Sequence, residues 1–234
     1  MIKRLLKLVA IAAVLAAGGA LGGMAAFYQC AGMMSFHQNS SQLPAQVVEK
    51  QEVVIQENKA LKNAFDKVKG AAIAIKITDA KGDVIHGSGV AITSDGLAAV
   101  PHDLYPPSSA AEIFSNGERV GFEVIKRDKE SNVAILKLQA SGLFTSGFYP
   151  AENLQLGERI FLAGILPEGG FFVNEGIARD FTEDAITTNI RETAAAAGAP
   201  AFDIEGNILG IAQVNKTGQV WVIPIWKIKE ISGL

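Results

Sequence analysis

The sequence predicts an all-β domain of barrel or sandwich type, set behind an apolar N-terminal segment and an amphipathic helix. After Gly70 the chain consists of short runs rich in valine, isoleucine and phenylalanine, a composition typical of β-strands. Turn signals such as Lys-Gly-Asp at 81–83 and Ser-Asp-Gly at 94–96 separate these runs. No long helical pattern lies between them, so a parallel α/β sheet is a poor fit. The predicted strands are residues 71–77, 83–93, 96–100, 111–115, 118–127, 133–139, 159–165, 171–181, 185–190, 207–214 and 219–225.

Composition and charge narrow the classes of structure and partner. The chain has 234 residues, is 49% hydrophobic and carries mixed charges, which excludes disorder over most of its length. A net charge of -3 argues against nucleic acid as an electrostatic partner. The single cysteine, Cys30, excludes an intrachain disulfide and a zinc site built on cysteine pairs. The sequence assigns no role to Cys30.

Residues 8–28 form an uncharged apolar stretch that is long enough to cross a bilayer core of about 30 Å as a helix. The basic residues Lys3, Arg4 and Lys7 precede it. They predict a cytoplasmic N-terminus, a single-pass membrane anchor and a C-terminal domain that is periplasmic or extracellular.

A cleaved signal peptide is the alternative, with small-residue cleavage sites at 20–22 or 23–25, and it would give a secreted protein. We favour the anchor, because the apolar run exceeds the ~7–15 residues of a signal core. Two overlapping GxxxG pairs, Gly18/Gly22 and Gly19/Gly23, would let two anchors pack closely. They indicate a homo-oligomer, unless glycine is simply common in this stretch.

A linker and an amphipathic helix follow the anchor. Residues 31–44 are polar and irregular, whereas residues 45–70 carry apolar side chains at helical spacing with Lys and Glu on the other faces. We expect the second half of this helix to pack on its own domain, and either packing or stalk self-association for the first half. The predicted organisation is a membrane anchor or signal segment at 1–30, a linker and helical stalk at 31–69, and the β domain at 70–231.

Five segments, in order, resemble the trypsin-like serine proteases of the HtrA (DegP) type. They correspond to that family's opening strands, its approach to the catalytic aspartate, its interbarrel crossing, its serine segment, and its closing strand and helix. The resemblance covers about residues 65–231. It implies two antiparallel six-stranded β-barrels with the active site in the cleft between them. The segments are residues 87–100, 114–139, 154–181, 186–214 and 221–231.

The catalytic positions of that family are altered here. Its Gly-Asn-Ser-Gly-Gly-Pro motif aligns with residues 195–200, so Ala197 stands where the resemblance places the nucleophilic serine, flanked by Ala195, Ala196 and Gly198. The family's aspartate aligns with Asn132. A methyl group cannot attack a carbonyl, and an amide cannot supply the negative charge that stabilises an imidazolium. Alanine at 195 also puts the oxyanion hole in doubt, since glycine often serves such turns through its backbone freedom.

The position of the histidine is ambiguous. In the family it falls seven residues after the Asp-Gly turn; from Gly96 this count reaches Asp103, with His102 one residue earlier. His102 matches if the turn is one residue shorter, and otherwise it is an ordinary loop histidine. Thr193 and Ser131 are the hydroxyls nearest in sequence to the altered positions, and neither has a visible second base.

No cofactor and no metal are expected. His37, His86 and His102 are isolated from other ligand residues in the sequence, and no Gly-rich phosphate loop occurs. Too few residues follow the closing strand for the PDZ domain that often follows this protease domain, so none is expected within the 234 residues.

Three functions are compatible with these features. The first is a membrane-anchored, proteolytically inactive trypsin-like domain that binds an unidentified protein or peptide on the non-cytoplasmic side by strand addition. The second is a structural or oligomeric scaffold, or a regulator of an active protease. The third is an active serine endopeptidase whose site is misaligned here, through a register error near residues 193–197. The residues favour the first.

Overall fold

The computed structural model describes residues 59–79, 81–105, 109–166 and 169–234. The predicted anchor at 8–28, the linker at 31–44, Cys30 and the first half of the predicted helix lie outside these residues. Within them, no helix has the length and the apolar character needed to cross a membrane.

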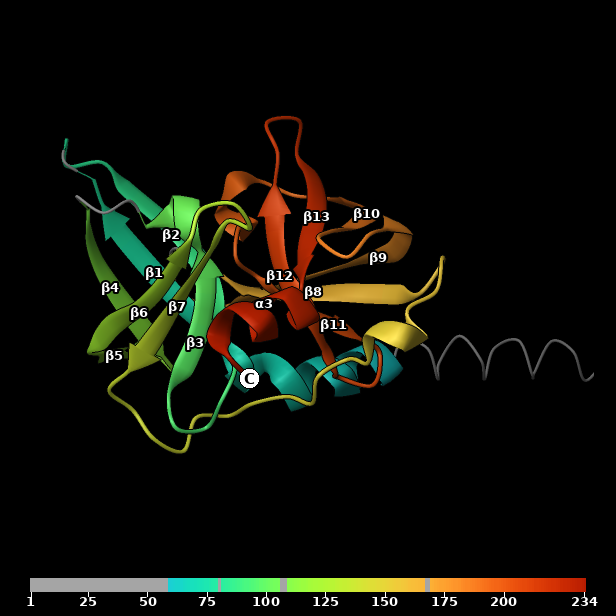
Figure 1. The fold of residues 1–234 in the computed structure, drawn as a ribbon, viewed down its shortest axis with the longest axis horizontal. Coiled ribbons are helices and arrows are strands. Elements are labelled where there is room, and N and C mark those ends of the chain that lie inside the picture. The colour runs from blue at the N-terminus through green and yellow to red at the C-terminus, as the bar shows by residue number, and fades with distance from the viewer. Residues whose placement is uncertain (1–58, 80, 106–108, 167–168) are drawn as a thin grey trace, which may run out of the picture. The chain divides into compact units, whose positions relative to one another are not determined.

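The first group of strands forms one antiparallel sheet. Its spatial order is β5-β4-β1-β2-β3-β7-β6. The strands occupy the left of Figure 1. Runs of consecutive buried residues occur in β2, β3 and β7, whereas β6 has no fully buried residue. The strands are β1 (Ala72–Thr78), β2 (Val84–Ala91), β3 (Leu97–Pro101), β4 (Ala110–Ser115), β5 (Glu118–Val120), β6 (Phe122–Asp128) and β7 (Val133–Leu138).

This sheet differs in detail from the predicted six-stranded barrel, because it has seven strands and its two edge strands do not pair with each other. The edges, β5 and β6, follow one another in the chain with only Gly121 between them. A Cβ at Gly121 would lie 2.3 Å from Oε1 of Gln139, the far end of a flexible side chain that can move aside. The bent chain, rather than a hydrogen-bonded ladder, therefore joins the two ends of the sheet.

The second group of strands forms a closed six-stranded barrel, in the order β10-β13-β12-β11-β8-β9. This confirms the predicted C-terminal barrel and the all-β class. The strands are β8 (Arg159–Ile165), β9 (Phe171–Phe181), β10 (Ile186–Arg191), β11 (Pro200–Asp203), β12 (Ile208–Val214) and β13 (Gln219–Pro224).

Two helices contribute side chains to an apolar cluster that the seven-stranded sheet and the closed barrel share. Helical residues 59–68 end in a 3₁₀ turn at Lys69–Ala71, and α3 (Ile225–Ser232) follows β13. Each sheet has its own apolar cluster. A third cluster combines Ala64 and Val68 of the first helix with Ile228 of α3 and side chains from both sheets. The second half of the predicted helix therefore packs on the β domain, as expected.

Candidate functional site

The loop that carries Ala197 lies between β10 and β11. A 3₁₀ turn at Ala194–Ala196 shapes it, and short alanine side chains suit such a tight turn. The carbonyl of Ala197 accepts a hydrogen bond from the Ser88 N–H at 2.9 Å. Ser88 is fully buried in β2, so this bond fixes the C-terminal barrel loop against the N-terminal sheet.

Gly198 brings the same loop close to the end of β3. Its φ is +81°, and a Cβ there would lie 1.8 Å from the Ser88 carbonyl oxygen and 2.8 Å from Cδ of Pro101. Only glycine meets both conditions. Because Pro101 immediately precedes His102, the Ala197–Gly198 backbone lies beside the histidine segment.

Asn132 joins that segment to the C-terminal barrel. It lies in the turn between β6 and β7 with φ +54°, a conformation that asparagine tolerates. Its backbone carbonyl accepts a bond from the His102 N–H at 3.1 Å. Its side-chain Oδ1 accepts from the Asp103 N–H at 2.9 Å, and its Nδ2 donates to Oε1 of Gln213 at 3.1 Å.

Asp128 holds the turn that places Asn132. Its Oδ1 accepts the N–H groups of Glu130 at 3.0 Å and Ser131 at 3.3 Å, and its Oδ2 accepts the Ser131 hydroxyl at 3.2 Å. Burial raises the pKa of the Asp128 carboxyl, but these donors outweigh burial and hold the pKa below its ordinary value. The Ser131 hydroxyl therefore supports the turn.

The imidazole of His102 does not contact Asn132 or Ala197 through any hydrogen bond between described residues. Its Nδ1 lies 3.4 Å from the Asp103 carboxylate, and 15% of the His102 side chain is exposed. The N–H of Asp103, not the imidazole of His102, donates to the Asn132 side chain. Asp103 is also the residue that lies seven positions after Gly96. The structure thus brings together the three segments that the family resemblance matches to the triad, which carry Ala197, Asn132 and the His102–Asp103 pair.

The backbone N–H groups around Ala197 determine whether an oxyanion hole can form in this loop. An oxyanion hole needs backbone N–H groups that point at the substrate rather than into the protein. Here the Ala197 N–H donates to the Ala194 carbonyl at 3.1 Å, and the Ala196 N–H donates to the Thr193 carbonyl at 3.0 Å. Ala195 lies within this turn and does not have a positive φ. The amide at the nucleophile position is therefore satisfied inside its own loop.

Gln213 is a site residue that the sequence reasoning missed. It is 8% exposed, on β12, and its side-chain Nε2 has no hydrogen-bond partner among the described residues. The available signal was a lone amide inside the otherwise apolar run 208–214, because a polar residue in a buried strand needs a specific partner.

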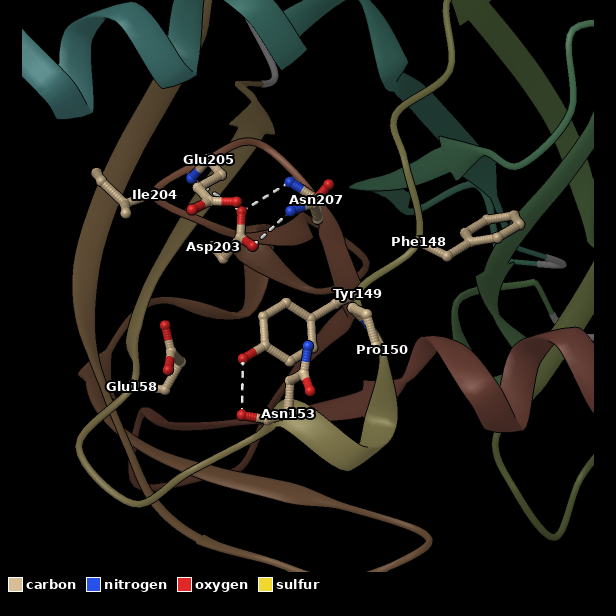
Figure 2. Close-up of a pocket in the computed structure, with 9 residues that line it drawn as sticks. All are labelled: Phe148, Tyr149, Pro150, Asn153, Glu158, Asp203, Ile204, Glu205 and Asn207. Atoms are coloured by element: carbon tan, nitrogen blue, oxygen red, sulfur yellow. Dashed lines mark hydrogen bonds between the residues drawn. The ribbon is translucent and has the colours of Figure 1, made fainter.

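A concavity of about 340 Å³, separate from the Ala197 loop, lies on the C-terminal barrel. Its lining includes Tyr149, Glu158 and Asp203. Figure 2 shows Asp203 turned toward Asn207. Its Oδ1 accepts the N–H groups of Glu205 and Asn207, and its Oδ2 accepts the Asn207 side chain, so Asp203 closes a turn. Burial, followed by the nearby Glu158 and Asp203, raises the pKa of Tyr149. Among the described residues, no three histidine, cysteine or acidic side chains form a metal-binding group.

Comparisons with known proteins agree with this geometry. A family profile described as a trypsin-like peptidase domain matches residues 87–211. A probable periplasmic serine endoprotease of the DegP-like type from Halomonas elongata is 27% identical over 137 residues. That match covers 53% of this chain and 28% of the relative, so the chain spans just over a quarter of the relative's length.

Solved structures share the fold at low identity. The HtrA-type protease AlgW, determined with a tripeptide, has a TM-score of 0.67 at 19% identity, over 74% of this chain and 62% of AlgW. The serine endoprotease from Yersinia pestis has a TM-score of 0.67 at 16% identity, over 74% of this chain and 65% of that protein. Because the profile spans more than half of the sequence, including Asn132 and Ala197, this chain belongs to the trypsin-like peptidase domain family, with relatives of the HtrA type.

Proposed function

We propose that this protein is a proteolytically inactive trypsin-like domain that binds an extended segment of another protein without cleaving it. A serine protease requires a nucleophile, a base and a carboxylate in contact. The chain has Ala197 and Asn132 at two of these positions, while Gly198 and the bond from Ser88 to Ala197 retain the backbone that places them.

The hydrogen bond from the Ala197 N–H to the Ala194 carbonyl is the observation that carries the proposal. In an enzyme that lacks only its nucleophile, the oxyanion hole still accelerates the reaction to a residual extent. In this chain one of the expected oxyanion donors is occupied, so that residual contribution is also reduced. Loss of nucleophile, carboxylate and oxyanion donor together favours binding over catalysis.

The proposed location is the non-cytoplasmic side of a membrane, with residues 8–28 as a single anchor. Support comes from the basic residues Lys3, Arg4 and Lys7 that precede this stretch. The Halomonas elongata relative is described as periplasmic, which agrees with that side. Secretion after cleavage of a signal peptide is the alternative location.

A second candidate function, a scaffold built from copies of this chain, is favoured by the outward face of β9. Phe171, Val173, Ile177 and Phe181 are 37–44% exposed on this one strand, with the charged Glu175 and Arg179 between them. A mixture of exposed apolar and charged side chains is compatible with a contact between copies. Sedimentation equilibrium of the full chain tests this candidate, because a scaffold forms oligomers whose assembly Val173→Glu prevents.

The principal test is peptide capture. The full chain is incubated with a library of extended peptides, and the retained peptides are identified by mass spectrometry. We expect retained peptides of unchanged mass. Shortened peptides that persist in the presence of general protease inhibitors and in the Ala197→Gly variant would show that the chain is an enzyme with another nucleophile. A monomeric chain that retains no peptide would contradict both candidate functions.

A further inference from the structure

A groove of about 1090 Å³ lies over the outer face of the seven-stranded sheet, on strands β1 and β4 of Figure 1. The end of the first helix, the end of β8 and the start of β9 form its walls. Its lining shares no residue with the hollow of Figure 2. Its volume is comparable with the largest sites for small molecules, about 1,000 Å³. The lining includes Ala74, Lys76, Phe114, Phe144, Leu166 and Phe171.

The middle of the groove is apolar. Ala74 and Phe114 lie opposite one another in the β1–β4 ladder, on the face of β1 away from the buried side chain of Ile75. Alanine leaves a depression beside the phenylalanine ring. At the walls, Phe144 and Phe171 are 42% and 44% exposed. A depression bounded by exposed apolar side chains is typical of ligand sites.

The backbone groups of β1 are engaged within the sheet. This strand pairs with β2 over Ala72–Thr78 and with β4 over Ile73–Thr78, and the side chains of Ala74 and Phe114 have no polar atoms. An extended peptide on this floor would leave the backbone groups that face it without hydrogen-bond partners, which is costly. A hydrocarbon chain has no such groups. The floor therefore favours an acyl chain over a peptide strand.

One end of the groove carries a surplus of positive charge. Lys76 of β1 lies 3.6 Å from the Glu112 carboxylate, and Arg119 of β5 lies 2.9 Å from the same carboxylate. Two cations thus share one anion. At the other end, beside the start of β1, Lys69 and Asp66 form a balanced pair. The Lys76 end therefore attracts an anion to a chain whose net charge is -3.

We propose that this groove binds the carboxylate form of a long-chain fatty acid. The acyl chain lies on the apolar floor beside Phe114 and extends toward Phe171. The carboxylate lies at Lys76, which shares its only carboxylate partner among the described residues, Glu112, with a second cation. The inference goes beyond the proposed peptide-binding function, because the lining of the groove does not include the Ala197 loop.

The test is photolabelling of the full chain in phosphatidylcholine nanodiscs by a long-chain fatty acid that carries a diazirine on its tail. Mass spectrometry identifies the labelled peptides. We expect label near Ala74, Phe114 and Phe171, and also in residues 8–28, the proposed anchor, which would take it up from the bilayer. An excess of the unlabelled acid should abolish labelling of the groove. Its uncharged methyl ester should require a concentration about threefold higher or more.

Two variants with matched controls locate the tail and the carboxylate. Ala74→Trp fills the depression, and Ala151→Trp, in the exposed 3₁₀ turn at 151–153, is its control. Lys76→Met removes the charge, and Lys216→Met, exposed in the turn between β12 and β13, is its control. We expect Ala74→Trp to reduce groove labelling about tenfold or more, and Lys76→Met to weaken binding about threefold. Both controls should label as the native chain does.

Labelling confined to residues 8–28 overturns the inference. Equal groove labelling in the native chain and a folded Ala74→Trp variant also overturns it, and so does equal competition by the acid and its ester, which needs no variant. Displacement of the label by an amphipathic helical peptide, but not by the unlabelled acid, would assign the groove to a protein segment instead. None of these outcomes depends on peptide capture, so the proposed function is tested separately.

Discussion

Asn132 contacts both sheets through its backbone carbonyl and both ends of its side-chain amide. Its Nδ2 donates to Oε1 of Gln213, so the Gln213 amide is oriented with its own donor, Nε2, buried and unsatisfied. A buried donor without a partner costs about 1–3 kcal/mol. A carboxylate at position 132 would accept from Nε2 once the Gln213 amide rotated.

We therefore predict that Asn132→Asp unfolds in urea within about 1 kcal/mol of the native chain at neutral pH. The new carboxylate accepts both the Asp103 N–H and Nε2 of Gln213, which compensates for its burial. Asn132→Gly is the control, because glycine tolerates the φ of +54° but loses both side-chain bonds, and it should be less stable by about 1–3 kcal/mol. Equal destabilisation in the two variants would contradict this account of Gln213.

The lowered pKa of Asp128 makes the free energy of unfolding depend on pH, and it also sets the sign of that dependence. A carboxyl whose pKa is lower in the folded state contributes stability above its unfolded pKa of 3.8, and this contribution is lost as pH falls through the folded pKa. Urea unfolding should show the native chain more stable than Asp128→Asn at neutral pH, with the difference shrinking in acid below the unfolded value. A difference independent of pH would show that the carboxylate charge does not hold the Asn132 turn.

Among the secondary-structure elements, the helix at residues 59–68 is part of the folded β domain. Val68 is fully buried in the cluster shared by the two sheets, and Ala64 is 4% exposed. Phe65 packs edge-on against Phe171 with ring centroids 5.7 Å apart. The helix therefore stabilises the β domain.

Val68→Ala should lower the free energy of unfolding by about 2 kcal/mol, from two lost methyl groups and the cavity that remains. Lys62→Ala, on the exposed face of the same helix, should change it by less than about 0.5 kcal/mol. Chemical denaturation of the three proteins checks this. Equal stabilities would mean that the helix does not contribute to the core.

The strands show which elements local sequence can predict. Runs of β-branched residues between turn signals predicted most of them, because those residues are buried on one face. Residues 118–127 were predicted as one strand, but Gly121 bends the chain and divides it into β5 and β6. Residues 200–203 were not predicted, since β11 begins with Pro200 and ends with Asp203, which are typical of turns. Its four residues are all buried, so tertiary packing, rather than local sequence preference, holds these residues in a strand.

The site was predicted in part for the same reason. Ala197 and Asn132 were identified only through the resemblance to the family's serine and aspartate motifs. The contacts that join them cross long sequence distances, from Ser88 to Ala197 and from Asn132 to Gln213. No local pattern encodes such contacts, nor the bond from the Asp103 N–H to the Asn132 side chain.

For the whole molecule, the trypsin-like fold is kept although Ala197 and Asn132 stand at two positions that the family resemblance assigns to catalysis. Each sheet keeps its own apolar cluster, and the third cluster joins them. These apolar contacts involve none of the residues that the family resemblance matches to the triad. Backbone requirements remain at Gly198, where any side chain would clash with Ser88. Asn132 does contribute hydrogen bonds to the fold, so the apolar core alone is independent of the matched positions.

The central claim, absence of proteolysis, is tested most directly by cleavage of labelled casein with the purified full chain. The parallel variants are Ala197→Ser with Asn132→Asp, and the same pair with Asp103→His. The account predicts no cleavage by the native chain above buffer, and any gain only in the variant that carries all three catalytic groups. Casein cleavage by the native chain that persists in Ala197→Gly, after purification to constant specific activity, would contradict it.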